Sequence, residues 1–154
     1  MTYTISGLPP SQFAQLFKLN DAELAERGAM RVVATANPGF PCRISLADAQ
    51  VGETVIVLHH VSHDVATPYR AAYAIYVRDT DDCASFANCL PPVMRARPLG
   101  LRGFDSGAML LDARLAAAGE ADAAIGQLFA NPAIAYIHAH NAAHGCFVAR
   151  IDRT

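Results

Sequence analysis

The stretch YIHAHNAAHGCFVARID, from Tyr136 to Asp152, decides the fold because it reads as two strands joined by a tight turn. Its first part alternates between apolar and polar residues, which is typical of a strand with one buried face. A second run of apolar residues follows Gly145, and a glycine in the left-handed conformation suits a three-residue loop with a bulge. We therefore expect an antiparallel hairpin.

The register of this hairpin decides which side chains share a face. With a three-residue loop, His140 lies opposite Val148 and His138 lies opposite Arg150, with Cys146 on the same side. A four-residue loop would instead place Cys146 with the core. Histidine, cysteine and arginine together suggest a semi-enclosed cleft, while a plain surface or a dimer seam remains the alternative. The other side is apolar and predicts a core face, made of Ile137, Ala139, Phe147, Ala149 and Ile151.

The rest of the chain predicts an α+β fold. Strands that follow one another directly near the C-terminus imply antiparallel pairing. We expect a single globular domain over residues 1–154, with one curved, mostly antiparallel sheet of about six to seven strands and helices packed over part of it. The expected helices are residues 8–19, 20–28 and 119–132, and the expected strands are residues 2–6, 30–36, 53–60, 69–78, 95–105, 108–116, 133–140 and 146–152.

Composition excludes several classes of protein. Of the 154 residues, 53% are hydrophobic and 17% are charged, which predicts a folded chain. No run reaches the roughly 18 apolar residues of a membrane span. The net charge of −2 argues against general nucleic-acid binding. The first residues, MTYTISGLPP, do not resemble a secretion signal, and the four cysteines include no CxxC pair. We therefore expect a cytoplasmic location with reduced thiols.

The histidine face could carry metal or acid–base chemistry. An H-x-H pair on a strand directs two imidazoles the same way, as zinc sites do, but no carboxylate lies nearby in sequence. We therefore expect no bound metal and no cofactor. The alternative is a metal-dependent enzyme whose third ligand is His144, Cys146 or a histidine of residues 59–63. The expected catalytic residues are His138 and His140, which can exchange protons near neutral pH, and Cys146, whose thiol could pair with His140. For Cys146 alone, the sequence favours the alternative of a small buried residue without reactivity.

Five further residues could bind a small anion, because arginine, tyrosine and amide groups donate hydrogen bonds to oxyanions. Arg43 ends the rigid loop NPGFPCR, where it either clamps the loop to nearby carbonyls or grips a ligand. Arg70 either binds a ligand or pairs with Asp64. The full expected set is Arg43, Tyr69, Arg70, Asn141 and Arg150.

Arg102 and Asp105 lie in LRGFDSG, where they predict a local ion pair and a turn cap. This interpretation gives neither residue a place in the expected binding site.

Four segments together resemble an uncharacterised bacterial family that is defined only as a domain of unknown function. They are GFPCR, TPYR followed by AIYVR, LRGFD, and AYIHAHNAAHGC, whose last part has the form HxHNAxxGC. The resemblance spans nearly the whole chain. It implies that these segments belong together and transfers no activity.

These observations leave three functional hypotheses. The first is a domain that binds a small anionic metabolite in a cleft lined by histidine, arginine and tyrosine, with acid–base chemistry by a histidine. The second is a non-catalytic homodimer whose interface is the hairpin face. The third is the metal-dependent enzyme.

Overall fold

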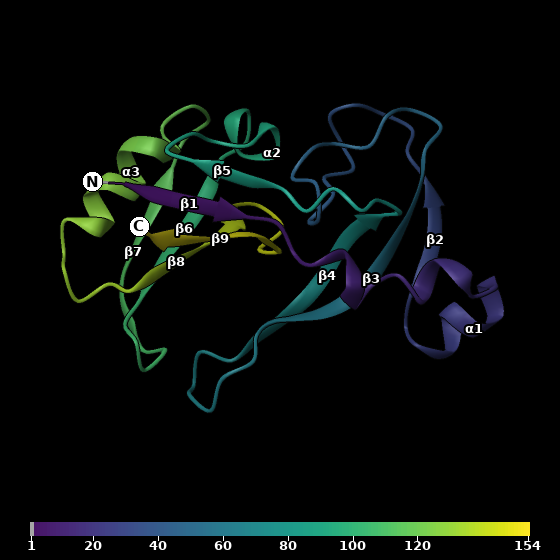
Figure 1. The fold of residues 1–154 in the computed structure, drawn as a ribbon, viewed down its shortest axis with the longest axis horizontal. Helices are drawn as coiled ribbons and strands as arrows, with labels where there is room; N and C mark the ends of the chain where they lie inside the picture. Colours follow the sequence, from purple (N-terminus) through teal and green to yellow (C-terminus); the bar gives the residue numbers. More distant parts are fainter. Residues whose placement is uncertain (1) are drawn as a thin grey trace.

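The main element of the structure is a six-stranded antiparallel sheet with the strand order β5-β1-β9-β8-β6-β7 (Figure 1). The structure is a computed structural model that describes residues 2–154. It confirms the α+β class and the antiparallel pairing near the C-terminus. The strands are β1 (Tyr3–Ser6), β5 (Ser85–Ala87), β6 (Leu99–Phe104), β7 (Leu110–Ala116), β8 (Tyr136–Asn141) and β9 (Phe147–Arg153).

A second sheet holds three antiparallel strands, β2 (Met30–Val33), β3 (Thr54–His63) and β4 (Ala71–Arg78). The sequence suggested one sheet for all these strands, and the structure divides them between two. The outer edge of β4 explains the division. Cys42 bridges to Tyr76 there, and the backbone N–H of Arg43 donates to the carbonyl of Tyr76 at 3.1 Å. Since this part of the edge is already hydrogen-bonded, β4 cannot pair with a strand of the main sheet there.

The helices are short. The first one, α1 (Asp21–Glu26), has the expected capping box between Asn20 and Glu23, and Gly28 follows it with a φ of 66°. Residues 8–19 form two 3₁₀ turns, η1 (Pro10–Gln12) and η2 (Leu16–Lys18), rather than one helix. The remaining helices are α2 (Pro92–Arg95) and α3 (Ala121–Phe129).

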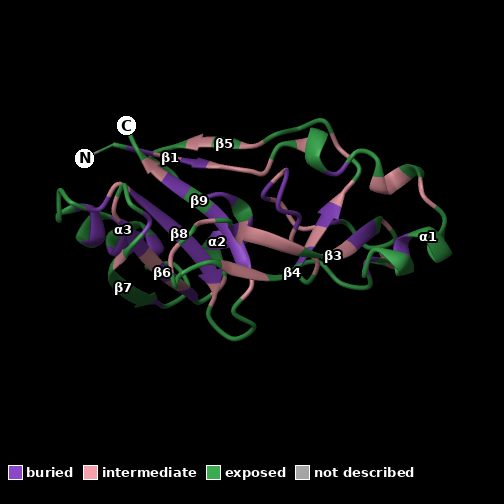
Figure 2. Cartoon of the chain, turned by 90° about the horizontal axis from the view of Figure 1, so that it is seen from below, coloured by how far each residue is buried: buried purple, intermediate pink, exposed green. Residues whose placement is uncertain are grey.

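The larger core lies between α3 and the main sheet. Ile125 and Leu128 of α3 are fully buried there with Leu101 of β6 and with Ile137 and Ala139 of β8. Every residue of β8 except its last is buried, and the strand lies inside the main sheet between β9 and β6 (Figure 2). Within residues 2–154, no helix is long and apolar enough to cross a membrane.

The hairpin of β8 and β9 forms as expected, but its turn differs. His138 lies opposite Arg150, as the sequence predicted. A bulge follows, so that His140 lies opposite Phe147 instead of Val148. The N–H of Asn141 donates to the carbonyl of Cys146 at 2.8 Å and closes a loop of four residues, 142–145, rather than three. The predicted register is therefore right at the open end of the hairpin and wrong at the turn.

Candidate functional site

Two buried histidines lie side by side on one face of β8. His138 and His140 have rings 6.3 Å apart and are 2% and 4% exposed, respectively. Ile137 and Ala139 point to the opposite face and join the core, which confirms the alternation predicted for this strand. The histidine face is covered from within the chain, because His63 at the end of β3 lies against His138, with ring centroids 4.8 Å apart.

A cavity of about 260 Å³, which we name the histidine cavity, opens between these rings and the loop that joins β3 to β4. Arg102 and Phe104 of β6 form one wall, and Tyr69 and Arg70 of the loop form another. No aspartate or glutamate is among its lining residues. The full lining is His63, Pro68, Tyr69, Arg70, Ala71, Arg102, Phe104, Leu110, His138 and His140.

Hydrogen bonds fix the ring of His63. Its Nδ1 lies 2.9 Å from the carbonyl oxygen of Tyr69, which can only accept, so Nδ1 carries a proton. In the neutral ring, Nε2 then accepts a hydrogen bond from the hydroxyl of Tyr136 at 2.7 Å. His63 therefore connects the β3–β4 loop to β8, and both of its ring nitrogens have a hydrogen-bond partner.

The other two imidazoles are less constrained. Nδ1 of His140 lies 3.0 Å from the carbonyl oxygen of Gly145 and must donate to it, which leaves the Nε2 lone pair of the neutral ring without a protein donor. Nδ1 of His138 is buried and has no hydrogen-bond partner among the described residues. A buried N–H without an acceptor is rare, so the neutral His138 ring carries its proton on Nε2.

Burial keeps both rings uncharged at neutral pH. It lowers the pKa of His138 from 6.5 to about 3, with a further contribution from His63. Burial likewise lowers the pKa of His140 to about 4, and the charge of Arg102 acts in the same direction, although the hydrogen bond to Gly145 opposes the shift. At pH 7 the histidine cavity thus offers the neutral imidazoles of His138 and His140 and the cationic guanidinium groups of Arg70 and Arg102.

Arg102 corrects one sequence-based interpretation. Asp105 does cap its turn, accepting hydrogen bonds from the N–H groups of Gly107 and Met109 at 2.8 and 2.9 Å. However, Arg102 does not pair with it. The side chain of Arg102 lines the histidine cavity and forms no hydrogen bond or ion pair within residues 2–154.

The expected site residues divide between different places. Tyr69 and Arg70 lie with His138 and His140 at the histidine cavity, where Arg70 also pairs with Asp64 at 2.9 Å. Arg150 stacks over the ring of Tyr136, 3.9 Å from its centroid, and pairs with Asp152.

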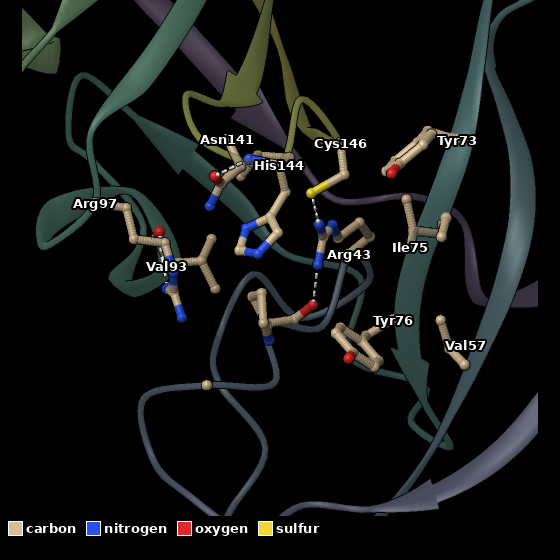
Figure 3. A pocket seen from close by; sticks show the side chains of 14 residues that line it. Arg43, Val57, Tyr73, Ile75, Tyr76, Val93, Arg97, Asn141, His144 and Cys146 are labelled. Atoms are coloured by element: carbon tan, nitrogen blue, oxygen red, sulfur yellow. Dashed lines mark hydrogen bonds between the residues drawn. The ribbon is translucent and has the colours of Figure 1, made fainter.

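The expectation of one cleft is therefore wrong for four of the residues, of which Arg150 lines neither the histidine cavity nor a second cavity. Arg43, Asn141 and Cys146 line this second cavity, which Figure 3 shows and which we name the arginine cavity. The two cavities share no lining residue. The four-residue loop accounts for the position of Cys146, because it pairs Cys146 with Asn141 and so turns it away from His140.

Two polar residues of the histidine cavity lie outside the expected catalytic and binding set. The sequence indicates His63 only as one candidate third ligand of the alternative metal site, and nothing in its local sequence indicates that it contacts Tyr136. Arg102 could have been found, because it alternates with Phe104 on a strand and would share a face with it. The part of the chain that the structure describes contains no group of three or more His, Cys, Asp or Glu side chains that could hold a metal ion.

Comparison with protein families gives one match. Residues 39–153 match the model of a family described as a protein of unknown function, DUF1203. The chain belongs to this family. The matched region includes every residue that lines either of the two cavities, and it agrees with the resemblance found in the sequence. Neither the curated proteins nor the solved structures contain a match to the chain.

Proposed function

We propose that the histidine cavity binds a small anionic metabolite, with Arg102 holding the anionic group. The observation that carries this proposal is the state of Arg102, a cation without a protein counter-charge at a cavity that no carboxylate lines. A guanidinium presents a planar fork of donors that suits carboxylate, sulfate and phosphate oxygens. The N–H of His138 would supply a further donor.

We further propose that His140 acts as a proton acceptor toward the bound molecule. Its Nδ1 is fixed by the carbonyl of Gly145, so that Nε2 is left to accept a proton from a ligand. Burial is the main cause of the low pKa of His140, and the neighbouring positive charge of Arg102 lowers that pKa further. A bound anion would oppose that charge and raise the pKa of the imidazole by roughly 1–3 units. Proton uptake and anion binding therefore favour each other.

Sodium sulfate provides the test, because sulfate does not titrate between pH 6 and pH 8. The midpoint of thermal unfolding should rise with sulfate relative to chloride at equal ionic strength, and more at pH 6 than at pH 8. Arg102→Gln should lose this specific rise. The control Arg114→Gln should keep it, since Arg114 is exposed on β7 and pairs only with Asp112. An equal response in all three proteins would refute the proposal.

The homodimer is the second candidate, at a different surface from the one expected. The histidine face of the hairpin is buried within the chain and offers no interface. The outer edge strand β7 is apolar and open instead, with Leu111 42% and Leu115 79% exposed. An exposed edge strand can pair with a second copy of itself. Sedimentation of the protein and of Leu115→Lys would test this alternative.

We infer a cytoplasmic location in a bacterium. This inference rests on the sequence resemblance and on the four cysteines, Cys42, Cys83, Cys89 and Cys146, none of which forms a disulfide.

A further inference from the structure

The arginine cavity lies where the two sheets meet and is separate from the histidine cavity. It has a volume of about 270 Å³ and is enclosed by the segment before Arg43, by β4 and by the β8–β9 turn (Figure 3). In the close view, the side chain of His144 points into it between Arg97 and Arg43.

Arg43 forms the most buried polar part of this cavity, being only 2% exposed. Its Nε donates to the carbonyl of Phe147 at 2.7 Å, its Nη1 donates to the carbonyl of Pro41, and its Nη2 lies 3.1 Å from Sγ of Cys146. None of these partners is a carboxylate. A guanidinium has five N–H groups, so two of them have no protein acceptor among the described residues.

The charges around Arg43 do not balance. Arg97 also lines the cavity, and its Nη1 donates to Asp48 at 3.0 Å. Asp48 is thus engaged by Arg97 and by the N–H of Gly39. Asp48 therefore pairs with the partly buried Arg97 and not with the buried Arg43, and no acidic residue lines the cavity itself. A buried charge without a counter-charge is costly, which favours a ligand that brings one negative charge.

The wall across the cavity from Arg43 determines which chemical groups the rest of the ligand can carry. It consists of aliphatic and aromatic side chains, of which Tyr73 and Ile75 come from β4 and Val57 from β3 (Figure 3). Val93 and Val148 add further apolar surface. Such a wall suits hydrocarbon and would exclude a compact, fully hydrated ion.

We propose that the arginine cavity binds a monocarboxylate with an apolar body. The carboxylate lies toward Arg43 and His144, and the body lies against Ile75 and Tyr73. Sulfate or phosphate, the simplest ligands for the histidine cavity, would leave this apolar wall uncovered. The two cavities therefore differ in the class of anion that they select.

Cys146 provides a built-in reporter, because its thiol lies inside the cavity beside Arg43. Iodoacetate and iodoacetamide alkylate thiols alike, but only iodoacetate carries a carboxylate. The exposed thiols of Cys83 and Cys89 are internal controls on the same chain. Peptide mapping by mass spectrometry should give an iodoacetate-to-iodoacetamide rate ratio at Cys146 that exceeds the ratio at the controls by at least about tenfold, the effect of one charge-assisted hydrogen bond.

A protection experiment tests the apolar wall. Phenylacetate should slow the alkylation of Cys146 by iodoacetamide, whereas phenylacetamide and sulfate should not. Arg102→Gln should leave both results unchanged, which separates this proposal from the one for the histidine cavity. His144→Gln should lower the rate ratio without affecting the fold, because His144 is exposed on a turn.

Three results would overturn the proposal. One is an equal rate ratio at all three thiols, and another is the absence of protection by phenylacetate. The third is a failure of both reagents to reach Cys146, because a cavity closed to a two-carbon reagent cannot admit the larger carboxylate.

Discussion

The buried histidines predict a loss of stability in mild acid that a single substitution should reduce. In the unfolded chain, each imidazole has an ordinary pKa near 6.5 and binds a proton as the pH falls below that value. In the folded chain, His138 and His140 remain unprotonated down to about pH 3 and about pH 4. Their folded pKa values are depressed, so acid favours the unfolded state.

The size of the effect follows from these values. Each pKa unit corresponds to about 1.4 kcal/mol, and pH 5 lies about 1.5 units below the unfolded pKa, so each histidine should cost about 2 kcal/mol. These two histidines together should therefore lower the free energy of unfolding by about 4 kcal/mol between pH 7.5 and pH 5. Burial also lowers the pKa of His60, which adds to the loss in the same direction. The lowered pKa values of Asp48 and Glu53 affect stability only at lower pH, where unfolded carboxylates begin to protonate.

The variant His138→Phe isolates one of the two contributions. Its ring would lie among aromatic neighbours, with Phe104, Tyr136 and Phe147 all within 5.5 Å between centroids. Since Nδ1 of His138 has no protein partner, the change breaks no hydrogen bond at that atom. We expect the contribution of His138 and His140 to the acid-induced loss to shrink from about 4 to about 2 kcal/mol, while the contribution of His60 stays.

Urea unfolding, followed by far-UV circular dichroism and tyrosine fluorescence at pH 7.5, 6.5 and 5, measures the free energy at each pH. His144→Gln is the control, because His144 is exposed on the β8–β9 turn. It should show the same pH dependence as the unsubstituted protein. The reasoning fails if His138→Phe loses as much stability at pH 5 as the unsubstituted protein does.

Three shorter predictions concern the stability of the protein and its metal content. Arg43→Lys should lower the free energy of unfolding by about 2–3 kcal/mol in urea, because an ammonium cannot reach the carbonyls of Phe147 and Pro41 and the sulfur of Cys146 together. Gly7→Ala should cost about 3 kcal/mol or more, since a Cβ there would lie 1.9 Å from the carbonyl oxygen of Ile44, whereas Gly100→Ala meets nothing within 4 Å and should fold normally. Elemental analysis of the isolated protein should find no stoichiometric zinc, because the H-x-H pair lacks a nearby carboxylate in sequence.

Local patterns in the sequence were sufficient for most of the elements. The capping box of α1 could be read from Asn20 and Glu23, and the faces of β8 could be read from the alternation of histidine with Ile137 and Ala139. Both depend on residues within a few positions of one another. Such short-range preferences act in the same way in any surrounding structure.

The bulge in β9 could not be predicted in this way. Gly145 has the expected positive φ of 77°, but a left-handed glycine fits loops of three and of four residues. The choice depends on tertiary contacts. Arg43 donates to the carbonyl of Phe147 and lies beside Cys146, so that a residue about 100 positions away holds the turn. The prediction that all the expected site residues share one cleft is wrong for the same reason, because it also depends on contacts between distant parts of the chain.

The contacts that join the two sheets also build the two cavities. His63 connects β3 to the hydroxyl of Tyr136, and Arg43 connects the edge of β4 to the carbonyl of Phe147. Each of these side chains lines a different cavity. A ligand in either cavity would therefore add contacts across the same junction, and the midpoint of unfolding should rise with either ligand. If both cavities bind, sulfate and phenylacetate should raise the midpoint together by more than either does alone, and Arg102→Gln should remove only the part due to sulfate.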